Sequence, residues 1–250
     1  MNYCKKIIVW FIFGALVFSL GSFSYDKRNE SSQDVSILFE NFAGNSFLKL
    51  DSALYSNALG QSFTISKWRY YISNIHLMRT DENDYILNDY FLVDEEEPDS
   101  KSILLKEIPI GNYSAISFTL GVDSLHNCSG IQSGALDPVK GMFWAWNTGY
   151  VFLKIEGKSA QSASPGNSIE FHIGGYKQPA NCIRTVKLTF NKEKIINESN
   201  IHSIIRIKAD ALEIFKSPVS IDFSKLSSVT DYHNAALVAD NYSDMFSLLE

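Results

Sequence analysis

The chain has 250 residues and a formal net charge of −6 at pH 7, with 45% hydrophobic and 13% aromatic residues. This length and apolar content are enough for one domain with a sizeable core. The negative charge offers no basic surface to a phosphate backbone, which argues against nucleic acid as a partner.

The amino terminus has the pattern of a secretory signal. Two lysines among residues 1–6 precede an apolar run from Ile7 to Leu20, and the small residues of Ser22-Phe23-Ser24 follow it. The run is short for a transmembrane helix, and charged residues come soon after it. We therefore predict cleavage near Tyr25 and a periplasmic or cell-surface location, with an uncleaved anchor as the alternative.

This cleavage divides the chain into three parts. Residues 1–24 are the predicted signal peptide, residues 25–33 a polar linker and residues 34–250 one folded domain. We expect no stable membrane span once the signal has been removed.

Two cysteines, Cys128 and Cys182, remain after removal of the signal. In an oxidising compartment such a pair is usually a disulfide. A bridge across this loop would stabilise the fold by about 4 kcal/mol in the chain-entropy model. We predict the disulfide; a thiolate copper site, which would need both cysteines reduced, is the competing interpretation.

Short segments rich in β-branched and aromatic residues alternate with turn residues, and no long stretch has a 3.6-residue apolar period. This pattern predicts an all-β domain, an antiparallel β-sandwich with a short C-terminal helix near residues 235–250. The expected strands are residues 35–42, 62–65, 68–78, 85–93, 114–121, 150–156, 168–174, 185–190 and 201–209. We expect 68–78 and 150–156 to be central.

Enzyme signatures are missing from the sequence. It contains no G-x-S-x-G, H-E-x-x-H, G-x-x-x-x-G-K or G-x-G-x-x-G motif, so we expect a protein without catalytic residues. The acidic run at residues 94–97 lacks the alternating oxygen positions of a calcium loop, and a solvated loop is the better interpretation.

The histidines occur singly, without a local H-x-H or H-x-x-x-H pair. Any metal site must therefore be assembled by the fold. His76 and His202 lie in expected strands, and His172 lies just before Gly174-Gly175, where neighbouring strands can bring imidazoles together. For each of them an ordinary surface or core role is the alternative.

The segment 141–150 holds two of the four tryptophans. If it is extended, Trp144 and Trp146 share one face. Core packing is one interpretation, and an aromatic ligand groove formed with Phe143 and Tyr150 is another. Unmodified tryptophan is a poor metal ligand, because its indole nitrogen only donates.

A series of motifs, taken in order, resembles the MbnP-like family of periplasmic copper-binding proteins, over residues 35–250. The motifs are 68–75 (WRYYISNI), 108–113 (IPIGNY), 120–123 (LGVD), 136–138 (LDP), 141–150 (GMFWAWNTGY), 154–157 (KIEG), 171–174 (FHIG) and 239–242 (ADNY).

The resemblance implies an exported β-sandwich that binds copper through histidines, for copper acquisition, storage or delivery. In some members a di-haem partner enzyme oxidises a tryptophan to kynurenine, and the opened ring frees an aniline nitrogen as a donor. Imidazole suits copper. Carried over to this chain, the strongest ligand candidate is His172, the further candidates are His76, His126 and His202, and the candidates for oxidation are Trp144 and Trp146.

Two functions of other classes remain open at this point. One is a module that binds a sugar or peptide in the aromatic groove of Phe143, Trp144, Trp146 and Tyr150. The other is a structural surface protein that uses its sheets only for assembly.

Overall fold

The computed structural model describes residues 31–81, 83–144, 149–197, 203–230 and 232–249. The predicted signal peptide and residues 25–30 of the predicted linker lie outside them, as do Trp146 and His202. Among the described residues, no helix is long and apolar enough to cross a membrane.

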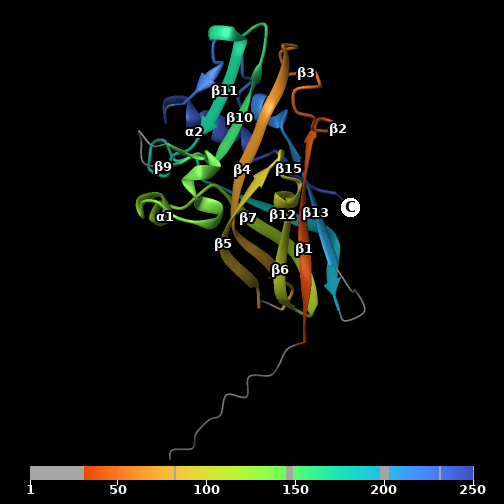
Figure 1. Ribbon diagram of the computed structural model, residues 1–250. Helices are drawn as coiled ribbons and strands as arrows, with labels where there is room; N and C mark the ends of the chain where they lie inside the picture. Colours follow the sequence, from red (N-terminus) through yellow and green to blue (C-terminus); the bar gives the residue numbers. More distant parts are fainter. Residues whose placement is uncertain (1–30, 82, 145–148, 198–202, 231, 250) are drawn as a thin grey trace, which may run out of the picture.

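Two β-sheets form the body of the molecule, which is elongated along its strands (Figure 1). The smaller sheet has the order β15 (Phe246–Leu248), β13 (Ser203–Asp210), β1 (Ser32–Ala43) and β2 (Ser46–Phe47), with β6 (Ser102–Pro109) also paired to β1. The larger sheet has the order β12 (Arg184–Ile196), β7 (Gly111–Leu120), β4 (Ser62–Arg79), β10 (Leu153–Lys158), β11 (Ser168–Ile173) and β14 (Ser228–Val229), with β3 (Tyr55–Ser56) and β5 (Tyr85–Asp94) also paired to β4.

The remaining elements are short. They are the two-stranded pair β8 (Phe143–Trp144) and β9 (Gly149–Tyr150), the α-helices α1 (Ser124–Cys128) and α2 (Tyr232–Tyr242), and the 3-10 turns η1 (Pro98–Lys101), η2 (Gly134–Leu136), η3 (Pro138–Lys140), η4 (Pro165–Asn167) and η5 (Glu213–Phe215).

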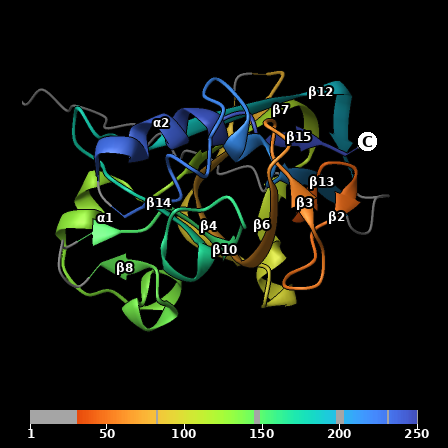
Figure 2. The same ribbon diagram turned by 90° about the horizontal axis from the view of Figure 1, so that it is seen from above.

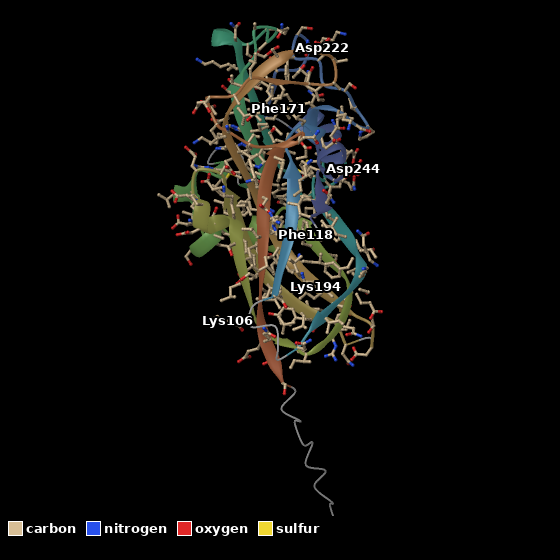
Figure 3. All side chains as sticks on the ribbon, turned by 90° about the vertical axis from the view of Figure 1, so that its right-hand side faces the viewer. Lys106, Phe118, Phe171, Lys194, Asp222 and Asp244 are labelled. Carbon is tan, nitrogen blue, oxygen red and sulfur yellow. The ribbon has the colours of Figure 1, made fainter. Side chains whose placement is uncertain are left out.

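Aromatic side chains join the two sheets. Phe39 of β1 packs edge-to-face against Tyr70 of β4 and Phe118 of β7, and Phe118 packs in the same way against Phe246 of β15. These rings alternate with outward-facing neighbours along each strand, as the two-residue period of a strand requires. Phe118 lies among the side chains between the layers, and Phe171 lies farther along the same interior (Figure 3). The expected all-β sandwich is confirmed.

Strand β4 is the central strand of the larger sheet, as expected for residues 68–78. Strands β10 and β7 share one edge of it end to end, because Tyr71 donates its N–H to Phe152 and accepts from Gly121. Strand β5 pairs with the other edge. The expected strand 150–156 is divided between β9 and β10, and β10 lies between β4 and β11.

Several features differ from the expectation. Strand β1 pairs with β13 in parallel, so the sandwich is not purely antiparallel. Strand β6 was not expected, since Lys106 and Glu107 interrupt its alternation and Glu107 has a positive φ of 56°. The C-terminal helix ends at Tyr242, because Phe246 pairs with Ala209 and adds β15 to the smaller sheet.

A segment that we call the covering segment, residues 122–144 and 149–150, lies on the outer face of the larger sheet. Its carbonyl oxygens accept hydrogen bonds from that face: Ala135 from Tyr71, and Lys140 from Arg69. Seen from above, α1 and β8 lie beyond β4 and β10, on the side away from β13 (Figure 2). The covering segment gives this face its own layer of loops and short helices.

Candidate functional site

His172 lies on the outer face of the larger sheet, the face on which the covering segment also lies. Its strand, β11, alternates between buried residues that face the core and half-buried residues that face outward. The register places His172 beside Lys154 of β10, and Lys154 beside Arg69 of β4. The side chain therefore projects from a strand near the edge of the sheet, where its neighbours on β10 are set by cross-strand pairing.

A carboxylate holds the imidazole of His172. The Nε2 atom of His172 lies 2.8 Å from Oε1 of Glu156, on the neighbouring strand β10. This hydrogen bond is the main cause that lowers the pKa of Glu156, and it outweighs the opposing effect of burial. A histidine fixed through one ring nitrogen by a carboxylate presents the other nitrogen, here Nδ1, in a defined direction.

The indole of Trp144 lies over Gly174, one pleat beyond His172. A Cβ at Gly174 would be 2.8 Å from Cζ3 and 2.9 Å from Cη2 of Trp144, so only glycine allows this approach. Residues two apart in a strand point to the same face. Gly174 directly follows β11, two residues or about 7 Å of backbone from His172, so the buried Trp144 ring packs against the chain at the end of the strand that carries His172.

The basic side chains nearest His172 on this face have partners. Arg69 forms ion pairs of 2.8 Å with Asp94 and 2.7 Å with Glu96, and Lys154 donates to the carbonyl of Gly141 at 2.5 Å. Burial lowers the pKa of Lys154, which disfavours its positive charge beside His172. Of the acidic run at 94–97, Asp94 is buried at the end of β5, opposite Arg69, whereas Glu96 and Glu97 are exposed in the turn that follows, as expected of a solvated loop.

A second group of polar side chains lies where β5 meets α1. Nδ1 of His126 is 2.7 Å from the hydroxyl of Tyr90 and 2.9 Å from Oδ2 of Asp123. The Tyr90 hydroxyl donates to the same Oδ2 atom. These three residues form a compact cluster separate from His172.

Comparison with known proteins supplies the family. The MbnP family model matches residues 32–233. The chain belongs to the MbnP family. No curated protein matches it. Among solved structures it is similar to MbnP from Methylosinus trichosporium, with 14% sequence identity, a TM-score of 0.56 and coverage of 87% of this chain and 98% of that chain. At this identity the likeness shows a shared fold.

The predicted copper ligands of this MbnP family member do not converge in the described part of the chain. Arg69 of β4 lies in the same cross-strand row as His172. His76 lies seven residues farther along β4, so about 20 Å of strand separates the two histidines. His126 belongs to the cluster with Tyr90. No three His, Cys, Asp or Glu side chains among the described residues form a group that could hold a metal ion.

The expected disulfide is absent. Cys128 is exposed and donates to the hydroxyl of Tyr176, whereas Cys182 is buried and points toward the carbonyl of Gly174. Burial raises the pKa of the Cys182 thiol to about 12, which also disfavours a thiolate ligand there. The prediction failed because α1 keeps Cys128 at the surface while the core encloses Cys182.

The aromatic segment does not form an open groove in its described part. Tyr150 is buried and packs edge-to-face against Phe143 and Tyr71, and Trp144 is 7% exposed. These rings fix the covering segment to the sheet, which removes the main support for a groove that binds a sugar or peptide.

The sequence did not single out Glu156, Tyr90 or Asp123. A signal existed for Glu156, because the KIEG motif at 154–157 places it on the outward face of a strand. Its Gly157 is required for a close approach, since a Cβ there would contact the backbone of Thr64.

Proposed function

We propose that this MbnP family member is an exported copper-binding protein in which His172 provides a copper ligand on the outer face of β11. The observation that carries the proposal is the placement of Trp144 over Gly174, two residues after His172. An oxidisable tryptophan thus packs at the end of the strand that carries the histidine ligand. This is the pair that the family resemblance requires.

The surroundings of His172 suit copper. Imidazole is a good copper ligand, and copper has the highest affinity among the divalent first-row metals. Glu156 fixes the ring through Nε2, an arrangement that orients metal-bound histidines and raises their basicity. Its negative charge also offsets the charge of a bound cation.

A single imidazole does not complete a copper site, so other donors are needed. We assign one of them to Trp144 after oxidation to kynurenine, because ring opening converts a nitrogen that only donates into an amine with a lone pair. A di-haem enzyme is the proposed partner: it would catalyse cleavage of the indole C2–C3 bond with dioxygen as the oxidant, and hydrolysis would then release C2 as formate. The chain's own role is to bury the indole against Gly174, at the end of the strand that carries His172.

The proposal gives the protein a binding role, in copper acquisition, storage or delivery, and assigns it no catalytic residue. The structural surface protein is the competing function, and it would need neither the histidine–carboxylate pair nor the indole beside it.

Metal analysis and intact mass of the exported protein from its native host test the proposal together. We expect bound copper, an amino terminus near Tyr25 and a mass change located to Trp144 or Trp146. Protein that contains no copper, takes up none on titration and carries unmodified tryptophans would contradict it.

A further inference from the structure

The cluster of Tyr90, Asp123 and His126 is a second place where metal-ligating atoms meet. Tyr90 projects from β5, Asp123 precedes α1, and His126 lies in the first turn of that helix. Their three donor atoms, Oη, Oδ2 and Nδ1, lie in mutual hydrogen-bond contact. The side chains of His126 and Asp123 are 34% and 37% exposed, so an ion from solution can reach the cluster.

The three contacts share too few protons. The tyrosine hydroxyl carries one proton, Nδ1 of histidine carries at most one, and an ionised carboxylate carries none. At most two protons therefore serve three close contacts, so one contact has no proton of its own and a proton must be shared. A cation at the centre would satisfy all three atoms at once.

The backbone holds the cluster in place from the side of α1. Oδ1 of Asp123 accepts from the N–H of His126 at 3.0 Å, which leaves Oδ2 directed at the cluster. Buried Asn127 donates to the carbonyls of Val122 and Asp123 and accepts from the N–H of Tyr150. The helical turn is thus fixed to Tyr150, in another part of the covering segment, and the ligand atoms are supported by rigid neighbours.

The carboxylate of Asp123 is already directed at both of its neighbours. Its Oδ2 atom accepts from the Tyr90 hydroxyl and lies 2.9 Å from Nδ1 of His126.

This cluster is distant from His172. The cross-strand row that contains His172 reaches β5 at Asp94, three strand spacings or about 14 Å away. Tyr90 lies four residues farther along β5, which adds about 13 Å in the strand direction. The two positions are therefore about 19 Å apart. Figure 1 shows β10 and β11 toward one end of the molecule and β5 toward the other.

We propose that Tyr90, Asp123 and His126 form a second metal site, which binds a divalent first-row transition-metal ion independently of His172. One imidazole nitrogen and two oxygens match Cu²⁺ or Zn²⁺, with Cu²⁺ bound more tightly. Calcium takes six to eight oxygen ligands, which this set does not supply. Metal–ligand bonds of about 2 Å hold neighbouring donor atoms about 3 Å apart, so the two contacts of His126 are already close to that spacing, the Tyr90 and Asp123 oxygens must move apart to admit the ion, and water completes the coordination.

The test uses the mature protein with His172→Ala, so that the proposed copper ligand on β11 is removed from every sample. Titration with Cu²⁺ should still fill one site, and Zn²⁺ should bind there more weakly. A phenolate-to-copper charge-transfer band should appear in the visible spectrum, and Tyr90→Phe should abolish it. This result does not depend on the function proposed for His172.

Two more variants measure the other ligands. His126→Ala and Asp123→Asn should each weaken Cu²⁺ binding by at least about tenfold, the lower end of the loss seen even for outer-shell partners. Asparagine preserves the helix cap, and circular dichroism checks the fold. Leu125→Ala, at an exposed position of the same turn, is the control and should leave binding unchanged. Absence of Cu²⁺ binding in the His172→Ala protein, or binding that these ligand variants leave unchanged, would show a hydrogen-bonded cluster only.

Discussion

Trp144 packs directly over Gly174, with ring atoms that would lie within 3 Å of a Cβ at that position. The contact joins the covering segment to the end of β11. It also keeps a large indole at the end of the strand that carries His172, a neighbourhood that the separation of Trp144 and Gly174 in sequence does not indicate.

Gly174→Ala should destabilise the protein by about 1–3 kcal/mol, the usual cost of added volume in a packed interior. The new methyl group would meet both the Trp144 ring and the carbonyl oxygen of Tyr150, and the backbone atom cannot rotate away. Urea unfolding followed by tryptophan fluorescence measures this loss. A variant as stable as the parent would show that the indole does not lie over this glycine.

Glu156→Gln should weaken copper binding by about 10- to 100-fold, as is usual when the partner of a metal-bound histidine is replaced. The substitution preserves shape but removes the charge that orients His172. Glu170→Gln is the matched control, because Glu170 lies opposite Glu156 on the same face and makes no hydrogen bond to His172 among the described contacts. Copper competition titrations in a His126→Ala background compare them, and equal losses for both variants would refute an orienting role.

Native Cys128 should react with an alkylating reagent at neutral pH, whereas Cys182 should not. Cys128 is exposed, and burial raises the pKa of Cys182 to about 12, so its thiolate is scarce. Mass spectrometry of the exported mature protein should find one adduct when the protein is folded and two after unfolding without reductant. Finding no adduct after unfolding would instead reveal the disulfide.

Asp222 should contribute a pH-dependent part of the stability. Hydrogen bonds from Ser224 and Gln61 lower its pKa from 3.8 to about 2. A depressed folded-state pKa stabilises the protein above the unfolded pKa, and this contribution is lost as the pH falls through about 4 toward 2.

Asp222→Asn should therefore lower the free energy of unfolding at pH 7, and the difference from the parent should shrink toward pH 2. Asp244→Asn, at an exposed position farther along the chain (Figure 3), should show little effect. A difference for Asp222→Asn that stays constant between pH 7 and pH 2 would disagree with this account.

Periodicity predicted the strands well where one face is buried. The alternation through residues 68–78 indicated β4, and its inward rings do form the core. Strand β6 was missed because a charged pair and a positive φ break its pattern. The C-terminal helix was predicted to extend too far, because helix propensity carries no information about the long-range pairing of Phe246 with Ala209.

The site could be predicted only in part, because the pairing register of the strands decides which side chains face each other. The FHIG motif led to His172, but its partner Glu156 lies 16 residues away and faces it only through the pairing of β10 with β11. The Tyr90 cluster joins residues 33 and 36 positions apart. A scattered set of single histidines has no local spacing from which such partners can be read.

Copper affinity with and without the His172 imidazole tests the central claim most directly. In a mature His126→Ala background, which removes a ligand of the second cluster, we expect one copper site whose affinity falls at least tenfold, or about 1.4 kcal/mol, on His172→Ala. His76→Ala, at the histidine that β4 carries far from β11, should bind copper as the background protein does. Equal copper affinity with and without His172 would contradict the proposed function.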